Sequence, residues 1–334
     1  MPGTLGRSAG ATDTGRRRRH NEDSYVVSPP VFAIADGMGG ARAGEVASRL
    51  AAAVVDEGVG DERGEERVAE LIREANRRVF QRSSEDEETS GMGTTMTVAL
   101  VDGSQIAFGH VGDSRAYRVR GGEIEQLTDD HSLVGELVRS GRLSREEADV
   151  HPQRSVITRA LGTEPDVDVD TFTVEAEPDD LYLLCSDGLT DMLSDREILE
   201  LLEANDDLDL AARRLVEAAN SNGGDDNITV VVFAMAAEGA AVEETVRMSP
   251  PPAAPAADDE DTLSGLDAVP VVDTAVVSTA EIERHLQREA AAAEAPASAR
   301  REPRPEPRRA LAPFLLLLVL VAALALLVVW GILR

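Results

Sequence analysis

Four acidic residues in this chain share one place in the sequence pattern: each lies where a short apolar run meets a tight turn. They are Asp36 after Val31–Ala35, Asp113 after Ile106–Gly112, Asp187 after Leu181–Ser186, and Asp226 just before Ile228–Val232. Any one of them alone is typical of an ordinary turn. Carboxylates that converge at one end of a sheet core, however, provide what a hard divalent cation needs. The pattern therefore predicts strands that end together around Mg²⁺ or Mn²⁺, because oxygen-only ligation favours these ions over zinc.

A fifth acidic element also contains arginine. The segment Arg18-Arg19-His20-Asn21-Glu22-Asp23 lies just before a strand-like run that begins at Tyr25. An arginine side chain offers a two-pronged fork for a phosphate or carboxylate, and acids beside it can bind a metal or orient its ligands. A metal site together with an arginine indicates phosphoryl chemistry.

Charge and cysteine content exclude several classes of protein. The chain has 33 basic residues, all of them arginine, against 62 acidic ones, and its formal net charge is -29. So large an acidic excess repels phosphate backbones at long range, which argues against nucleic acid as a partner. The single cysteine, Cys185, cannot form an internal disulfide. A cysteine-dependent phosphatase would need an arginine six positions later, where Asp191 stands.

The sequence changes character twice along the chain. Residues 1–236 alternate β-rich runs with helical patterns, including a polar helical segment over His131–Asp149, and they predict one α+β domain with largely antiparallel sheets. Residues 237–310 are rich in proline, alanine and acids, with nine of the 16 prolines between Pro250 and Pro307. Such a segment buries too little apolar surface to offset its ordering entropy, so we expect a mostly disordered linker.

A long apolar segment ends the sequence. Phe314–Leu333 contains no charged residue, and at 1.5 Å per residue it would be about 30 Å long, the thickness of a bilayer's hydrocarbon core. We therefore expect a transmembrane helix over residues 311–333. Several arginines from Arg300 to Arg309 precede the span and only Arg334 follows it. This asymmetry predicts a single-pass protein of the cell membrane with its N-terminal domain in the cytoplasm.

Taken together, the motifs resemble those of the metal-dependent protein phosphatases of the protein phosphatase 2C type, in their bacterial branch. The resemblance covers about Thr4 to Ala236. The motifs follow the family's order: Thr12–Gly15 through Asn21–Asp23, Asp36–Gly40, Gly93–Thr95, Val111–Arg115, Thr158–Gly162, Ser186–Leu189 and Gly224–Asn227. The resemblance implies a four-layer α-β-β-α sandwich of two mainly antiparallel sheets, with a binuclear Mn²⁺ or Mg²⁺ centre at one end.

The resemblance also implies a role for each site residue. Asp36 would bridge the two metals, and Glu22 with the Gly37 carbonyl would complete one metal site. Asp187 and Asp226 would bind the other metal, and Asp113 with Asp187 would form a looser third site. Asp23 and Asn227 would orient the ligands, and Arg18 would hold the substrate phosphate. His131–Ile157 matches the flap that borders the active site in the bacterial branch.

The chemistry implied by the family is direct hydrolysis. A water between two metals has a lowered pKa and can attack phosphorus in line, so no phosphoenzyme is needed. One position departs from the pattern of some members, which carry a histidine after the metal-binding Asp-Gly as a proposed general acid. Here that residue is Met38, so the leaving group must take its proton from a metal-bound water or another group.

We therefore expect a phosphatase that acts on phosphoserine and phosphothreonine in proteins and reverses Ser/Thr kinase signalling at the membrane. Its expected partners are phosphoproteins, including a Ser/Thr protein kinase and its substrates. Two alternatives remain at this point: a scaffold that binds phosphoproteins without hydrolysing them, and a phosphatase of a small partner-switching regulator. The complete ligand set argues against the scaffold.

Overall fold

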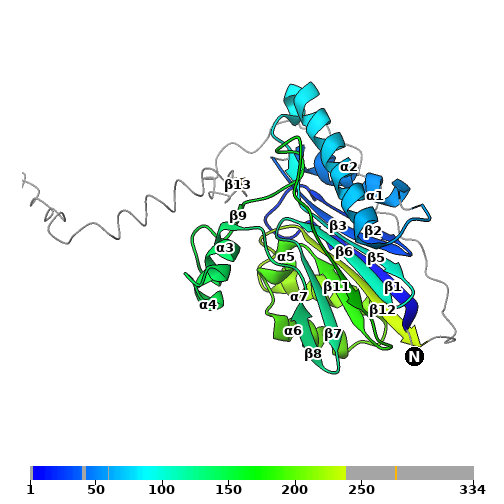
Figure 1. Ribbon diagram of the computed structural model, residues 1–334. Coiled ribbons are helices and arrows are strands. Elements are labelled where there is room, and N and C mark those ends of the chain that lie inside the picture. The colour runs from blue at the N-terminus through cyan, green and yellow to red at the C-terminus, as the bar shows by residue number, and fades with distance from the viewer. Residues whose placement is uncertain (1–2, 40–42, 59, 238–274, 277–334) are drawn as a thin grey trace, which may run out of the picture. The chain divides into compact units, whose positions relative to one another are not determined.

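Two antiparallel sheets form the centre of the folded domain (Figure 1). The computed structural model describes residues 3–39, 43–58, 60–237 and 275–276. In the first sheet the strand order is β1-β12-β11-β7-β8, formed by Gly3–Asp13, Ile228–Ala237, Leu181–Cys185, Arg115–Arg120 and Glu123–Gln126. In the second sheet the order is β10-β6-β5-β3-β2, formed by Asp170–Glu175, Gln105–Val111, Met96–Asp102, Val31–Met38 and Asp23–Ser28. The short strand β4 (Gly93–Thr94) pairs with β3.

Both faces of the central strands are buried, which explains their continuous apolar sequences. In β3, Phe32 and Ile34 point into the core between the two sheets, whereas the alternate residues Val31, Ala33 and Ala35 face a second core under the helices. Phe32 stacks on Phe233 of β12 with ring centroids 4.3 Å apart. This aromatic contact joins the sheets through strands that are distant in the sequence.

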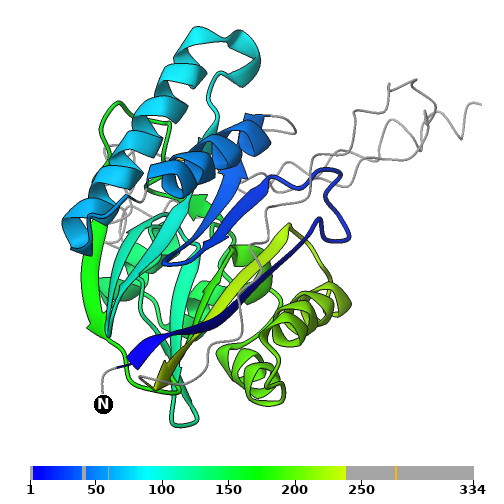
Figure 2. The ribbon, with the colours of Figure 1, turned by 90° about the vertical axis from the view of Figure 1, so that its right-hand side faces the viewer.

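Helices cover the outer face of each sheet (Figure 2). The second sheet packs against α1 (Ala43–Gly58) and α2 (Gly64–Glu85), and η1 (Glu87–Thr89) follows them. The first sheet packs against α5 (Asp187–Thr190), α6 (Asp195–Glu203) and α7 (Leu208–Ser221). Local signals set these boundaries: Ser194 and Glu197 form a capping box at the start of α6, and Asp207 caps α7. The predicted α-β-β-α order of layers is confirmed.

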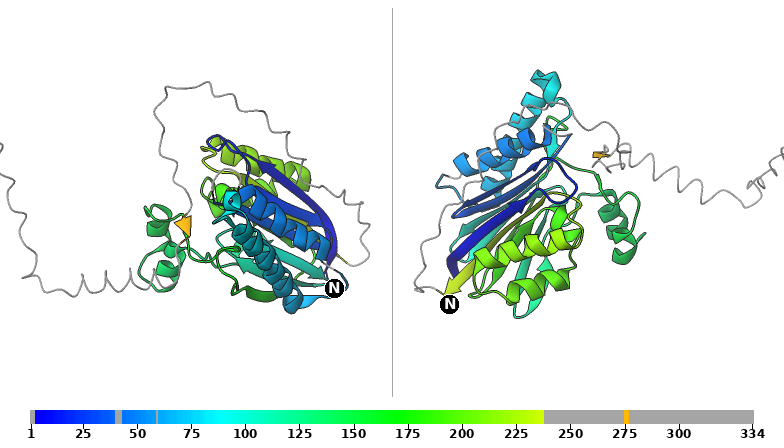
Figure 3. Two further views of the ribbon diagram at one scale, coloured as in Figure 1. Left: turned by 90° about the horizontal axis from the view of Figure 1, so that it is seen from above. Right: turned by 180° about the vertical axis from the view of Figure 1, so that it is seen from behind.

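A flap separates β8 from β10. It contains α3 (Leu133–Arg139), α4 (Arg145–Asp149) and β9 (Val156–Ile157), and it lies to one side of the sandwich (Figure 3). The two ends of the flap are held together by a bridge between Ser132 and Ile157. Strand β13 (Ala275–Val276) pairs with β9 in parallel.

The structure corrects the sequence analysis at two elements. The single helical segment expected over His131–Asp149 is two short helices, because Ser144 starts α4 with its own capping box. Strand β1 was not predicted, since its glycine-rich sequence has little apolar alternation. It forms through pairing with β12, from Ser8 opposite Phe233 to Asp13 opposite Ile228.

The membrane prediction concerns residues outside the described ranges. The span at 311–333 and nearly all of the linker at 237–310 fall there. Within the part that the structure describes, no helix has the length and hydropathy required to cross a bilayer.

Candidate active site

The predicted acidic residues meet at one end of the sandwich, where β3, β6 and β11 end and β2 and β12 begin. Pairing of β2 with β3 places Asp23 opposite Asp36. Asp187 follows β11 as the first residue of α5, and Asp226 lies two residues before β12. The charge of Asp36 interacts with Asp23, Asp187, Asp226 and Asp113. Residues from five separate segments therefore share one electrostatic environment.

Burial and mutual repulsion make these carboxyl groups hard to ionise. Burial raises the pKa of Asp36 and of Asp187 well above the usual range, and neighbouring aspartates raise both further. Burial also raises the pKa of Asp23 to about 7, with a contribution from the charge of Asp226. The pKa of Asp113 rises to about 7 through burial and the charge of Asp130. A bound cation would relieve this repulsion and keep the carboxylates ionised.

The donor set fits a hard divalent cation. Asp187 Oδ1 and Asp23 Oδ1 are buried and accept no hydrogen bond in the structure, and such oxygens normally have an ion or an ordered water as partner. Across the described residues, no three side chains of His, Cys, Asp or Glu form a ready cluster for a single ion. An ion here would therefore also need ligands from the main chain or from water, which Mg²⁺ commonly keeps.

Two glycines let Glu22 lie against the start of α1. A Cβ atom on Gly37 would lie 2.2 Å from the Gly44 carbonyl oxygen and 2.6 Å from that of Glu22. A Cβ atom on Gly44 would lie 2.4 Å from Glu22 Oε2. Only glycine fits at these two positions, so the backbone of residue 37 and the carboxylate of Glu22 approach the same point from β3 and from the β1–β2 loop.

Asn227 holds the β1–β2 loop in place. Its side-chain oxygen accepts the Glu22 amide proton at 2.8 Å, and its Nδ2 donates to the carbonyl oxygens of Thr14 and His20 at 2.8 and 2.9 Å. The same loop carries Arg18, whose Nη2 donates to Asp226 Oδ2 at 2.8 Å. The nearby charges of Asp226, Glu22 and Asp187 raise the pKa of Arg18 against the effect of burial. Arg18 thus lies beside the acidic group.

Hydroxyl groups that the sequence analysis missed orient two of the acids. Ser186 Oγ and Thr229 Oγ1 donate to Asp23 Oδ2 at 2.9 and 2.5 Å. Thr95 Oγ1 accepts the Asp36 amide proton at 3.0 Å, and Thr94 Oγ1 donates to the Asp36 carbonyl oxygen at 2.8 Å. Serine and threonine are too common for this role to show in a single sequence. Their position next to the acidic motifs was the available signal.

A groove of about 620 Å³ leads from the acidic group to the flap. Asp113 and Asp187 line it together with three flap residues, Arg139, Arg145 and Arg154. Arg154 Nη2 lies 3.3 Å from Asp191 Oδ2, which connects the flap to the turn after α5. The sequence analysis assigned Asp191 no role in the site, but Asp191 lies four residues after Asp187 and lines the same groove.

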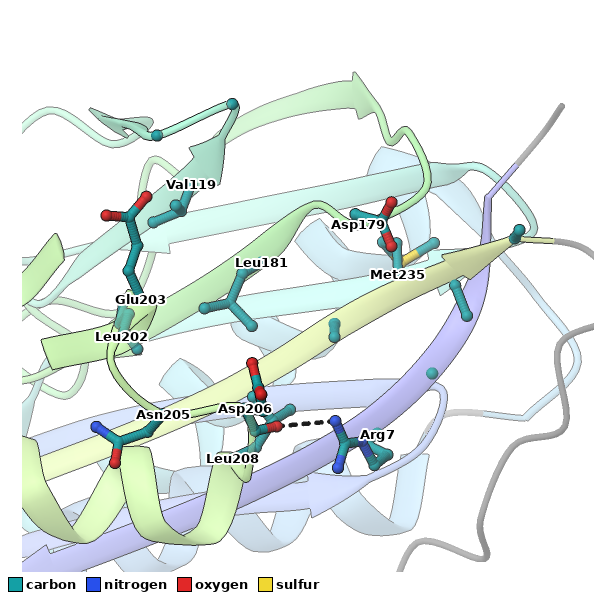
Figure 4. A pocket seen from close by; sticks show the side chains of 16 residues that line it. Arg7, Val119, Asp179, Leu181, Leu202, Glu203, Asn205, Asp206, Leu208 and Met235 are labelled. Atoms are coloured by element: carbon teal, nitrogen blue, oxygen red, sulfur yellow. Dashed lines mark hydrogen bonds between the residues drawn. The ribbon is translucent and has the colours of Figure 1, made fainter. Parts of the chain in front are cut away.

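Figure 4 shows a second cavity, with a volume of about 850 Å³. It is bounded by the far ends of β1 and β12 and by the α6–α7 turn, where Arg7 Nη2 donates to the Asp206 carbonyl oxygen at 2.8 Å. None of the predicted site residues lines it. The predicted phosphoryl chemistry is therefore assigned to the smaller groove, which Asp113 and Asp187 line.

Two further predictions concern single side chains. Cys185 is fully buried in β11, and burial raises the pKa of its thiol to about 12, which confirms that it is a core residue rather than a nucleophile. Met38 is buried in a small cluster with Ile157 and Ala160. The residue that replaces the histidine of some family members therefore packs against the base of the flap.

Comparison with known proteins agrees with this geometry. The family described as protein phosphatase 2C matches residues 14–228. The serine/threonine phosphatase stp of Listeria monocytogenes is 42% identical over 222 residues, which cover 63% of this chain and 88% of that protein. The serine/threonine protein phosphatase PstP of Mycobacterium tuberculosis is 43% identical over 216 residues, 64% of this chain and 42% of that protein.

Comparison with solved structures also shows similarity to bacterial serine/threonine phosphatases. The M. tuberculosis phosphatase PstP/Ppp superposes with a TM-score of 0.67 at 40% identity, over 70% of this chain and 100% of that one. The PstP catalytic domain in complex with two manganese ions superposes with a TM-score of 0.65 at 39% identity, over 70% of this chain and 99% of that one. With a family match that spans more than half of its length, the chain belongs to the protein phosphatase 2C family.

Proposed function

We propose that this protein hydrolyses phosphoserine and phosphothreonine in proteins by means of a metal-activated water. Its family membership makes it a protein serine/threonine phosphatase of the 2C type. The observation that carries the proposal is the group of buried, mutually repelling carboxylates beside Arg18 at the end of the flap groove. Support for the metal comes from a relative of 39% identity whose catalytic domain was solved with two manganese ions.

Each site residue has a role in this proposal. Two Mn²⁺ or Mg²⁺ ions, when bound, would supply a water of lowered pKa and offset phosphoryl charge. Asp36, Glu22 and the Gly37 carbonyl would contribute ligands to one ion, and Asp36, Asp187 and Asp226 would contribute ligands to the other, with water completing each set. Asp113 with Asp187 would hold a third ion more loosely. Asp23 and Asn227 would keep these ligands in place through their hydrogen bonds to Thr229 and to the β1–β2 loop.

Arg18 would bind the substrate phosphate. Its hydrogen bond to Asp226 uses Nη2, so its remaining N–H groups can donate to phosphate oxygens. Its side chain is 24% exposed, which gives a substrate access to the guanidinium. Met38 is buried and has no proton to give, so the proton for the leaving serine or threonine oxygen must come from elsewhere.

For the location and the partners, the support comes from the sequence alone. A span at 311–333, with arginines before it, would hold the catalytic domain at the cytoplasmic face of the cell membrane. There the enzyme would act on phosphoproteins that include a Ser/Thr protein kinase and its substrates. Fractionation of cells that express the full chain or residues 1–237 tests the anchor: the full chain should sediment with membranes and the truncated chain should not.

Phosphate release from a phosphothreonine peptide tests the activity. The full chain is assayed with Mn²⁺, with Mg²⁺ and with EDTA, and Asp187→Ala is the matched variant. We expect release that requires the metal and that the variant lacks. A folded wild-type protein that binds the peptide but releases no phosphate under any condition would refute the proposal and support the scaffold alternative.

A further inference from the structure

His131, at the entrance to the flap, contacts the turn that carries Asp113. It is 2% exposed and lies between β8 and α3. The turn Gly112–Ser114 joins β6 of the second sheet to β7 of the first sheet. One residue at the base of the flap therefore lies against the connection between the two sheets, next to an acid of the site.

Two hydrogen bonds join His131 to Gly112. The His131 amide donates to the Gly112 carbonyl oxygen at 2.7 Å, and the Gly112 amide donates to His131 Nδ1 at 3.0 Å. Both polar groups of the Gly112 backbone are thus satisfied by one residue of the flap. We call this pair of bonds the Gly112–His131 latch.

His131 also contacts three further residues, which hold it in position. The His131 carbonyl oxygen accepts the Thr158 amide proton at 2.8 Å, so the first residue of the flap is bonded to the residue that follows β9. The ring lies 4.7 Å from that of His110 at the end of β6. Nε2 lies 3.1 Å from Asp170 Oδ2 on β10, and Asp170 Oδ1 also accepts a hydrogen bond from Arg159 at 2.6 Å.

These contacts select one form of the imidazole. A backbone amide can only donate, so Nδ1 must carry the lone pair that accepts the Gly112 proton, and the ring proton must lie on Nε2, facing Asp170. Arg159 Nη1 is also 3.1 Å from Nε2, but both atoms carry protons, so Asp170 is the shared acceptor between them. The His131 ring is therefore neutral, and its acceptor atom Nδ1 binds the Gly112 amide of the turn that carries Asp113.

We propose that His131 is a positioning residue that makes the flap and the Asp113 turn move together. When both bonds of the latch are formed, His131, at the flap root, holds Gly112 in place. The backbone of the adjacent Asp113 is then held at the wall of the groove. When the flap root moves away, Gly112 loses both partners and the turn is released. The proposal goes beyond the proposed function, and only its turnover measurement rests on that function.

Two variants of similar size separate the latch from packing. In His131→Asn the amide oxygen can take the place of Nδ1 and accept the Gly112 proton. In His131→Gln the amide reaches the place of Nε2, toward Asp170, and leaves the Gly112 amide without a partner. Hydrogen exchange of the full chain with Mn²⁺ is then measured amide by amide.

We expect exchange at Gly112 to be about tenfold faster in the Gln variant and within about twofold of wild type in the Asn variant, since a buried amide without a partner favours local opening. The diagnostic amide is Thr158, whose bond to the His131 main chain is untouched by either substitution. It should also exchange faster in the Gln variant if the flap and the turn are coupled. Equal behaviour of the two variants, or a change at Gly112 alone, would overturn the proposal.

Turnover gives a second measurement. The Gln variant should need about tenfold more Mn²⁺ than the Asn variant for half-maximal phosphate release, because its Asp113 turn is less restrained. If wild type releases no phosphate, the proposed function fails while the exchange experiment still decides the latch. If the Gln variant does not fold, His131→Phe replaces it, because it keeps a ring against His110 and also lacks the acceptor.

Discussion

Gly188→Ala should disable the site by pushing two of its acids apart. A Cβ atom on Gly188 would lie 2.1 Å from the Asn227 carbonyl oxygen, whereas ordinary contact begins at 3.4 Å. Both groups belong to backbone that cannot rotate away. Gly188 directly follows Asp187, and Asn227 directly follows Asp226, so the start of α5 and the segment before β12 must separate together with their carboxylates.

The size of the effect follows from the geometry. Relief of the clash needs a separation of about 1 Å, and a displacement of that size at a catalytic site can lower kcat/KM about 100-fold. The cost in the free energy of unfolding should be about 1 to 3 kcal/mol, because one added methyl overpacks a single contact. The variant should therefore be folded and nearly inactive.

Steady-state hydrolysis of a phosphothreonine peptide with Mn²⁺ measures the first quantity, and urea unfolding measures the second. Gly3→Ala, at the far end of the first sheet, is the matched control, because the nearest atoms to its new Cβ are backbone atoms of Ala176 and Glu177 at 3.5 Å. The control should match wild type in both measurements. A Gly188→Ala enzyme with kcat/KM within twofold of wild type would show that the spacing of Asp187 and Asp226 does not limit the chemistry.

Other expected outcomes follow from the charges of the site. Asp36→Asn should reduce turnover at least about 1000-fold and yet raise the melting temperature of the metal-free protein, because it removes a buried carboxyl group that costs free energy either to ionise or to protonate there; a lower melting temperature in EDTA would contradict this. Arg18→Ala should raise KM for the phosphopeptide about tenfold or more, with Arg7→Ala as an exposed control, through loss of a charge-assisted hydrogen bond to phosphate. Mn²⁺ at 100 times its Kd should stabilise the wild type by about 2.7 kcal/mol for each ion bound, measured by urea unfolding, and EDTA should reverse the gain. The pKa of His131 is lowered to about 3 by burial and by His110 and Arg159, while Asp170 opposes the shift. The unfolded chain, whose histidine titrates near 6.5, therefore binds more protons below that pH. This contribution to stability, at most about 5 kcal/mol, is complete above about pH 6.5 and is lost as the pH falls toward 3. The stability difference between wild type and His131→Asn should accordingly shrink between pH 7 and 4.5, and a difference independent of pH would contradict the shift.

The sequence alone determined the strands that bury both faces and the acids at their ends. Val31–Ala35 and Leu181–Cys185 are apolar throughout because one face of each strand packs on the other sheet and the other face packs on helices. Chain-local signals also set the starts of α6 and α7. The motifs around Asp36, Asp187 and Asp226 carried enough information to assign the family before any coordinate.

Only the tertiary structure decided how these pieces meet. Strand β1 has no strong pattern of its own and depends on β12, more than 200 residues away in the sequence. The hydroxyls of Ser186 and Thr229 serve Asp23 only because β2 lies beside the other two segments in space. The latch at His131 likewise joins the flap to a turn nineteen residues earlier. A local pattern records the free energy of burying a face or capping a helix, whereas hydrogen bonds between distant segments depend on loop closure and packing, which leave no periodic trace in the sequence.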